Sequence, residues 1–407
     1  MLKRVVSFPL LLLYGLGTTI GAGIYALIGP VAGRAGSAAP IAFVIAALLA
    51  SITAVSFATL SARYPLAGGQ AIFFREAFGE RRLASGLALV VATTGAVSAA
   101  AIVRAFVGYV VVLAPVPPAL LLALSVALLV LLAWWGIEES LVAAGLFTLI
   151  EILGLLLVIW AGREALGDLP ARAGELWPGS GSGSWSGVFA AGLLAFYAFL
   201  GFEDMVNVAE EVRRVRRIMP LAIAATLVLS TLLYVLVAVV SVLVVPPEVL
   251  AESEEALALV YRVATGSDSQ VLRGIAVLAM LDGALIQIVM ASRVLYGLAG
   301  EPFLPSALGH VDAKRGTPDR ATLVVGAGVL GLALFLPVDR LAAGASALTL
   351  LVFVTVNASL FRLLRRDPAL RASTRVPAWL PLLGLVSNLL FLVASGWLLL
   401  AGGESPG

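Results

Sequence analysis

The sequence predicts an all-α integral membrane protein with about eleven transmembrane helices. First, 61% of the 407 residues are hydrophobic and only 12% are charged, whereas about 25% of the residues in a soluble protein are charged. Second, many apolar runs reach the roughly 20 residues that cross a bilayer. Third, the basic residues gather in alternate loops, which is the pattern of a multi-pass protein. These observations argue against a large soluble helical protein.

The apolar runs define the expected spans. They cover residues 8–31, 38–62, 83–113, 119–136, 142–162, 186–210, 219–245, 270–299, 321–336, 341–364 and 378–401. The ninth run is short for a full crossing, so we expect the bilayer to thin around it. Too few residues precede the first run for a charged leader with a cleavage site, which predicts a permanent span rather than a removed signal.

The Lys and Arg residues predict the orientation. With the N-terminus in the cytoplasm, 19 of them fall in inside loops and 6 in outside loops, and Arg104 lies in a span. An odd number of spans then puts the C-terminus outside. We therefore expect a multi-pass protein of the cell membrane, whose partners are the lipid bilayer and a small solute.

The residue types and motifs that the sequence lacks exclude several kinds of chemistry. The chain has no Cys, which excludes disulfides and thiol chemistry, and its single His, His310, excludes a histidine-rich metal site. Without a His or Cys constellation, we expect no enzyme, no cofactor and no metal site. We also expect no nucleic-acid partner, because the basic residues behind the net charge of +2 are distributed by membrane topology. No phosphate-binding loop of the GxxxxGK[ST] type is present, so transport energy must come from a gradient or from exchange.

Two short stretches with glycine, residues 15–23 and 199–203, each lie midway along an apolar span. Glycine weakens a helix by about 1 kcal/mol, and a freed backbone group in hydrocarbon costs several kcal/mol unless it is satisfied. A broken helix offers free N–H groups on one side and free C=O groups on the other. We expect the two breaks to face each other and to hold a zwitterion or amine. Close helix packing through Gly17 and Gly21 is the alternative.

The loop between Trp177 and Trp185 separates five spans from the next five, and each set opens with a glycine-bearing span. This symmetry predicts an inverted repeat. We expect a single domain over residues 1–407, with a first repeat at 8–162, a second at 186–364 and a peripheral helix at 378–401.

Four motifs resemble the amino acid–polyamine–organocation (APC) superfamily. They are residues 15–25 (GLGTTIGAGIY), 135–140 (WGIEES), 196–203 (FYAFLGFE) and 291–299 (ASRVLYGLA). The resemblance covers residues 8–365 in collinear order. It implies a five-plus-five inverted-repeat, LeuT-like fold with helices 1 and 6 unwound and a site between helices 1, 3, 6, 8 and 10. The chain departs from the common twelve-helix form by stopping after eleven, which leaves the oligomeric state open.

The resemblance also implies a substrate site at the two breaks. Amide N–H groups of the first break would receive a carboxylate, and carbonyl groups of the second would face an ammonium group. Tyr197 looks like the family's aromatic gate, and Ser98 comes from the third span. The remaining expected substrate-binding residues are Thr18, Thr19, Ile20, Gly21, Ala22, Gly23, Phe199, Leu200 and Gly201.

Four acidic residues, Glu151, Glu203, Asp204 and Asp282, lie inside expected spans, where charge is expensive and usually functional. Glu203 follows the second break and resembles the family's glutamate there. We expect it to fix the unwound backbone by accepting N–H hydrogen bonds, or to handle a proton. Asp204 points elsewhere on the helix and need not share that role.

Glu151 aligns with a fifth-helix position at which several APC relatives carry a lysine, in the place that sodium holds in sodium-coupled cousins. A carboxyl group there can bind a cation or take up a proton. We expect it to couple transport to protons, with Asp282 or Ser292 sharing its pocket. The alternatives are sodium coupling and a structural acid that is hydrogen-bonded between helices.

The sequence therefore predicts a secondary active transporter that moves amino acids by alternating access. A transporter or exchanger of polyamines or other organic amines is the alternative, although a polyamine has no carboxylate for the first-break amides. An ion channel would instead use the broken helices to hold ions.

Overall fold

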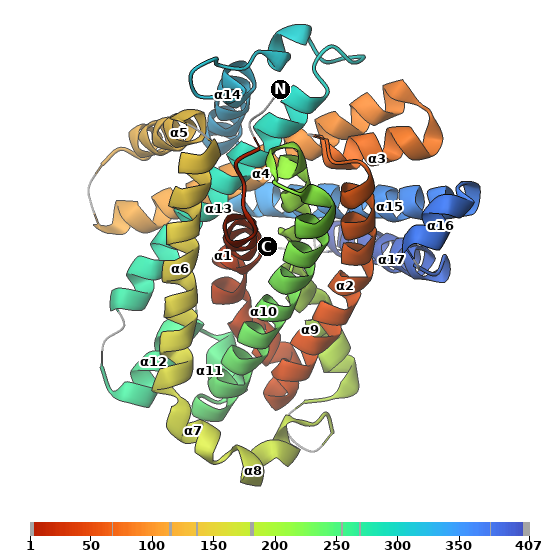
Figure 1. Ribbon diagram of the computed structural model, residues 1–407. Coiled ribbons are helices and arrows are strands. Elements are labelled where there is room, and N and C mark those ends of the chain that lie inside the picture. Colours follow the sequence, from red (N-terminus) through yellow and green to blue (C-terminus); the bar gives the residue numbers. More distant parts are fainter. Residues whose placement is uncertain are drawn as a thin grey trace.

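The computed structural model describes residues 4–66, 68–113, 116–135, 137–179, 183–253, 255–267, 270–374 and 376–401. Over these residues the chain is helical and contains no strand, which confirms the predicted all-α class (Figure 1). The long helices are α1 (Phe8–Ala35), α2 (Ala39–Arg63), α4 (Arg81–Leu113), α5 (Pro118–Trp135), α6 (Ile137–Ala161), α9 (Trp185–Tyr197), α10 (Val215–Val244), α13 (Gln270–Gly297), α14 (Asp319–Phe335), α15 (Val338–Arg366) and α17 (Trp379–Ala401).

Shorter helices connect the long ones. They are η1 (Gly36–Ala38), α3 (Gly69–Phe78), α7 (Arg163–Gly167), α8 (Leu169–Arg172), η2 (Ala173–Leu176), η3 (Phe202–Glu211), α11 (Pro247–Ala251), α12 (Ala256–Thr265), η4 (Ser306–Gly309) and α16 (Pro368–Thr374). The helices α7, α8, α11 and α12 lie in segments that fall between the expected spans. Gly136, Lys3 and Arg375, which entered the motif and charge arguments, lie outside the described residues.

Eight helical segments in the described part of the chain are long and apolar enough to cross a membrane, and shorter apolar helices accompany them. This makes the protein a multi-pass membrane protein. Each expected span falls on a helix, but the number eleven stays a prediction. The ninth expected span corresponds to α14, whose 17 residues reach about 26 Å at 1.5 Å per residue, short of the ~30 Å hydrocarbon core.

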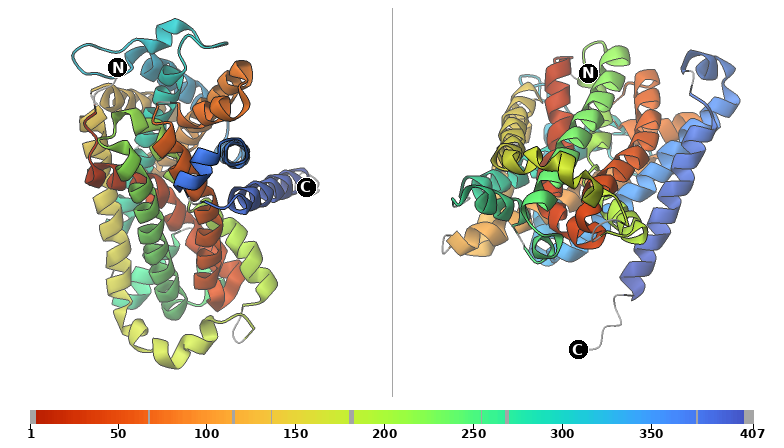
Figure 2. Two further views of the ribbon diagram at one scale, coloured as in Figure 1. Left: turned by 45° about the vertical axis from the view of Figure 1, so that its right-hand side comes forward. Right: turned by 90° about the horizontal axis from the view of Figure 1, so that it is seen from below.

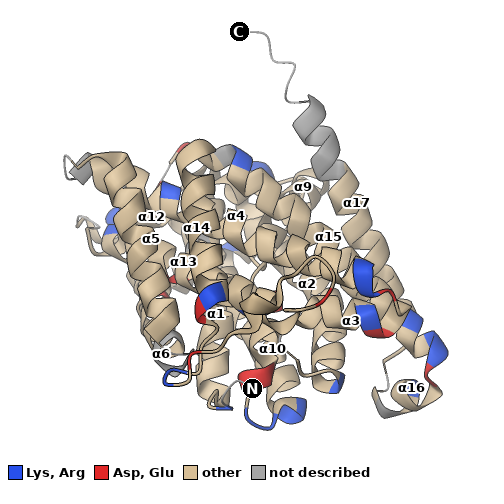
Figure 3. Ribbon diagram, turned by 90° about the horizontal axis from the view of Figure 1, so that it is seen from above, with Lys and Arg blue, Asp and Glu red and all other residues tan. Residues whose placement is uncertain are grey.

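Several of the segments expected on opposite sides of the membrane lie at opposite ends of the molecule, whereas α16 lies at its side (Figure 1). The N-terminus and α3 lie at one end of Figure 1, and α7, α8 and α11 lie at the other. Charged residues gather mainly at helix ends and in loops, and most of each long helix carries none (Figure 3). This distribution leaves an apolar belt for the lipid.

Helix α1 is central, because it packs against α6, α9, α10 and α13. The last helix, α17, lies at the edge of the bundle beside α15 (Figure 2). A buried polar network ties it there: Asn388 Nδ2 and Asn357 Nδ2 both donate to Thr53 Oγ1, at 2.8 and 3.0 Å. Ser56 Oγ donates to Asn357 Oδ1 at 2.8 Å. Hydrogen bonds of this kind join helices in lipid, where apolar burial does not.

A buried ion pair closes the end of the bundle that carries the N-terminus. The side chains of Arg293 and Glu211 are both fully buried, and Arg293 Nε lies 3.3 Å from Glu211 Oε1. The adjacent backbone is bridged to the N-terminal segment, because Val6 N donates to Glu211 O at 3.0 Å and Arg213 N donates to Val6 O at 2.9 Å. Charge pairing and backbone pairing together hold the N-terminal segment against the end of η3.

Substituting Arg293→Met should strongly destabilise the protein, because it leaves Glu211 as an uncompensated buried charge. Breaking such a pair costs about 3–5 kcal/mol. Thermal unfolding of the purified protein in detergent measures this loss. The double variant Glu211→Gln, Arg293→Met should recover most of it, and Arg82→Met, at an exposed position, is the control. A double variant no more stable than the single one would contradict this reading of the pair.

Candidate functional site

The first interruption lies at Gly21, inside α1. Its φ of 26° and ψ of −144° are not helical, and the positive φ is one that glycine adopts far more readily than other residues. A Cβ atom at Gly21 would meet nothing within 4 Å, whereas one at Gly17 would lie 2.3 Å from Thr148 Oγ1. The two glycines therefore differ: Gly17 is needed for close helix packing, and Gly21 is needed for its backbone conformation.

The second interruption separates α9, which ends at Tyr197, from η3, which begins at Phe202. Gly201 has a φ of 123°, and a Cβ atom there would lie 2.2 Å from the carbonyl oxygen of Thr18. Gly23 lies on the other side of the first interruption. A Cβ atom added there would lie 3.2 Å from the Cα atom of Ala198. The two interruptions therefore lie directly against each other.

Tyr234 of α10 bridges the two interruptions, a role that the sequence analysis missed. Its fully buried hydroxyl group lies 2.6 Å from the carbonyl oxygen of Thr19 and 2.9 Å from that of Ala198. The hydroxyl hydrogen is thus shared between one carbonyl group from each interrupted helix. The only sequence signal was a tyrosine in the middle of an apolar helix. Its ring packs edge-on against Phe199, with the ring centroids 5.0 Å apart.

Glu203 contacts the second interruption from inside η3. Its Oε2 accepts a hydrogen bond from the backbone N–H of Gly201 at 2.7 Å. The side chain of Gln70 donates in turn to the backbone carbonyl of Glu203 at 3.3 Å. A carboxyl oxygen thus takes up an amide that the broken helix leaves free.

A cavity of about 200 Å³ opens beside the interruptions, between α1, α4, α9, η3, α13 and α15. Its polar groups include the carboxyl groups of Glu203 and Asp204, and Gln287 Nε2 donates to Asp204 Oδ2 at 2.6 Å. The lining residues are Thr18, Thr94, Ser98, Ile102, Tyr197, Leu200, Gly201, Glu203, Asp204, Gln287, Ala345, Ser346 and Thr349. Two carboxyl groups and several hydroxyls at the centre of a membrane protein form a site that suits a small polar solute.

Some of the expected substrate residues line this cavity, and others do not. Thr18, Ser98, Tyr197, Leu200 and Gly201 line it. The side chains of Thr19, Ile20 and Phe199 are buried in the surrounding packing, and Gly21 and Gly23 do not line it. The side chain of Ala22 lies outside the described residues. The cavity residues Gln287, Ser346 and Thr349 were not expected from the sequence, although each is a polar residue within an apolar helix.

Glu151 and Asp282 form a second acidic cluster, which does not line the cavity. Glu151 is fully buried, and within the described residues neither of its carboxyl oxygens has a hydrogen-bond partner. Asp282 interacts with it electrostatically, and Thr148 Oγ1 donates to Asp282 Oδ2 at 3.0 Å. Tyr25 donates its hydroxyl hydrogen to the backbone carbonyl of Glu151 at 2.8 Å. The expectation that Asp282 lies beside Glu151 agrees with this arrangement.

Ser292 and Arg104 lie outside both clusters. Ser292 Oγ donates to Val289 O at 2.7 Å and accepts from Arg293 Nη1 at 3.0 Å, so it belongs with the buried ion pair and not with Glu151. Ten residues of helix place it about 15 Å from Asp282 along α13. Arg104 donates to the carbonyl of Ala333 in α14. In the described part of the chain, no group of three or more His, Cys, Asp or Glu residues could hold a metal ion.

Substituting Gly201→Ala should separate the two interruptions. The new Cβ atom would need the space of the Thr18 carbonyl, and the positive φ is itself strained for alanine. We expect a loss of more than about 2 kcal/mol in unfolding free energy, measured by thermal unfolding in detergent. Gly86→Ala is the matched control, because a Cβ there meets nothing within 4 Å. Equal stability of the two variants would refute the close contact.

Comparison with known proteins identifies the family. The profile of a family described as "Amino acid permease" matches residues 7–405. "Cationic amino acid transporter 2, vacuolar" of Arabidopsis thaliana is 31% identical over 391 residues, which cover 88% of this chain and 59% of that protein. "Branched-chain amino acid permease BcaP" of Bacillus subtilis is 28% identical over 425 residues, covering 97% of this chain and 89% of the relative.

An uncharacterized transporter of Mycobacterium tuberculosis is 33% identical over 364 residues, covering 88% of this chain and 80% of the relative. The chain spans about 60% of the length of the plant cationic amino acid transporters that it matches first. All of these relatives carry the names of permeases or transporters and none that of an enzyme. A match over nearly the whole chain, in a multi-helix membrane fold, shows that this protein belongs to the amino acid permease family of the APC superfamily.

Proposed function

We propose that the protein is a secondary active transporter that moves amino acids across the membrane by alternating access. The contact between Gly201 and the Thr18 carbonyl carries this proposal, because it joins two interrupted helices beside a polar cavity. Two relatives are named for cationic and for branched-chain amino acids, which supports an amino acid as the solute.

We infer a five-plus-five inverted repeat within one domain, with residues 8–162 as the first repeat and 186–364 as the second. Each begins with a helix that is interrupted at a positive-φ glycine, Gly21 or Gly201. Helix α17 packs on the outside of this core against α15 and α2. The two repeats would then rock against each other around the cavity.

The interruptions supply the groups that recognise an amino acid. Backbone N–H groups of residues 18–23 would bind the carboxylate, and the carbonyl groups of residues 199–201 would bind the ammonium group. Tyr197, at the cavity wall, would close over the solute. Glu203 and Asp204 add two carboxyl groups to the same cavity, whose oxygens could accept hydrogen bonds from a cationic side chain. A polyamine remains the second candidate, because it uses the carboxyl groups but leaves the amides without a carboxylate.

The cluster of Glu151 and Asp282 is the proposed coupling site. Two buried carboxyl groups close to each other cannot readily both be charged, so a proton held by the pair offsets their repulsion. The cluster lies against α1 at Gly17, where an added Cβ atom would lie 2.7 Å from Asp282 Oδ2. Sodium is the alternative cation, because carboxyl and hydroxyl oxygens also bind it.

We place the N-terminus in the cytoplasm and the protein in the cell membrane. The segments that carry most of the Lys and Arg residues lie at the N-terminal end of the bundle, as the positive-inside rule requires. Because the chain has no Cys, labelling of single introduced cysteines on intact cells checks this orientation directly.

Purified protein should be stabilised by its substrate and should accumulate it in proteoliposomes. A ligand at 100 times its Kd raises the unfolding free energy by about 2.7 kcal/mol. We expect L-arginine or L-leucine to give such a shift and to be taken up, and spermidine not to compete with them. Stabilisation and uptake by spermidine alone would assign an amine transporter. Cation flux without any organic solute would assign a channel.

Substituting Glu151→Gln should abolish proton-driven accumulation while leaving substrate exchange, because glutamine cannot take up the coupling proton. Uptake into proteoliposomes at several external pH values, with and without a sodium gradient, measures this change. Uptake by the native protein should rise as the external pH falls and should become insensitive to external pH in the variant. Glu164→Gln, an exposed acid far from the site, is the control. Unchanged pH dependence in Glu151→Gln would remove Glu151 from the coupling.

A further inference from the structure

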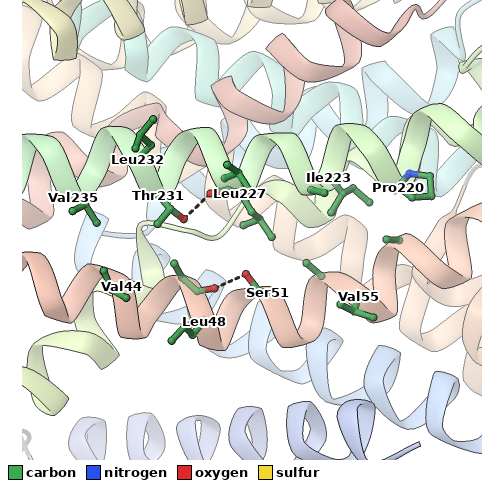
Figure 4. A pocket seen from close by; sticks show the side chains of 15 residues that line it. Val44, Leu48, Ser51, Val55, Pro220, Ile223, Leu227, Thr231, Leu232 and Val235 are labelled. Carbon is green, nitrogen blue, oxygen red and sulfur yellow. Dashed lines mark hydrogen bonds between the residues drawn. The ribbon is translucent and has the colours of Figure 1, made fainter. Parts of the chain in front are cut away.

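A groove of about 600 Å³ lies between α2 and α10, away from the substrate cavity (Figure 4). Its walls are almost entirely aliphatic. The two hydroxyl groups in it are satisfied within their own helices, since Ser51 Oγ donates to Ala47 O at 2.7 Å and Thr231 Oγ1 donates to Leu227 O at 2.6 Å. Several lining side chains are strongly exposed, among them Leu48 at 63% and Val228 at 65%. The groove therefore opens towards the hydrocarbon of the bilayer, and its volume lies within the ~300–1,000 Å³ of ligand sites.

The groove is long. It runs from Val44 to Ala58 along α2 and from Pro220 to Val235 along α10, which is about 21–22 Å at 1.5 Å per residue. That length exceeds the roughly 15 Å of hydrocarbon in one leaflet. Such a trough matches an extended acyl chain better than a compact apolar molecule.

One end of the groove carries positive charge. Arg216 and Arg217 lie four and three residues before Pro220, so they share the helix face that lines the groove. Both are exposed, and no ion pair is recorded for either among the described residues. Arg213 and Arg214 are exposed just before them. The buried acid of this region, Glu211, is already paired with Arg293.

We propose that the groove binds one acyl chain of an anionic phospholipid, whose phosphate group is held by Arg216 and Arg217. Arginine binds phosphate through two parallel N–H groups. Each basic residue near an anionic lipid surface strengthens binding by about fivefold. The apolar walls thus match the acyl chain of a lipid, and the two adjacent arginines match its phosphate group. The leaflet that supplies the lipid follows from the proposed orientation, but the site itself does not depend on the transport function.

Native mass spectrometry of the full chain in detergent tests this site. Dioleoylphosphatidylglycerol, which is anionic, should bind at least tenfold more tightly than dioleoylphosphatidylcholine, which is zwitterionic. The variant Arg216→Gln, Arg217→Gln should lose roughly 10- to 30-fold in affinity for the anionic lipid. Ala224→Trp, at an exposed groove position, should fill the groove and weaken both lipids. Arg82→Gln, Arg371→Gln is the charge-matched control at exposed sites elsewhere.

Four results would overturn the proposal. They are equal binding of the two lipids by the native protein, an equal loss of anionic lipid in the control variant, unchanged binding in Ala224→Trp, and displacement of the lipid by inorganic phosphate at the same concentration. The last result would assign a phosphate site without an acyl chain. A fifth result, dimers that disappear in Ala224→Trp, would also overturn the proposal and would assign the groove to a second copy of the chain.

Discussion

The central constraint on this structure is that backbone N–H and C=O groups freed inside a membrane must find partners within the protein. The two interruptions leave such groups inside the bundle, where Thr19 and Ala198 are buried. The amide of Gly201 is taken up by Glu203, and the carbonyls of Thr19 and Ala198 are taken up by Tyr234. These two partners come from two different helical elements, η3 and α10. The interrupted geometry therefore depends on the whole packing around α1, and a local sequence motif alone does not maintain it.

The sequence predicted where the helices break but not what stabilises the breaks. Glycine and a neighbouring glutamate are local signals, and Gly21, Gly201 and Glu203 were identified from them. Tyr234 and Gln287 are distant in sequence from the groups that they bind, so they look like ordinary polar residues in apolar helices. Ser292 was one of two residues expected beside Glu151. It lies about 15 Å from Asp282 along α13, and its hydrogen bonds join it to the ion pair.

The two readings of the first glycine motif turn out to apply to different glycines. Small residues allow helices to approach closely in membranes, and Gly17 serves this purpose against Thr148. Gly21 has open space where a side chain would project, but its dihedral angles are not helical. A sequence pattern of closely spaced glycines cannot separate these roles. The distinction rests on what each missing Cβ would contact, and only coordinates supply that.

Adjacent residues of α1 connect the acidic cluster to the cavity. Gly17 packs against Thr148 and Asp282, and the carbonyl of the next residue, Thr18, packs against Gly201. Both contacts are too close for an added methyl group, so neither side of α1 has room to shift independently. A change of charge between Glu151 and Asp282 alters the electrostatic force on this segment at a site that is one residue from the second interruption. Under the proposed coupling, a proton taken up by Glu151 and Asp282 would act on the cavity through this single turn of helix, without a longer chain of side chains between them.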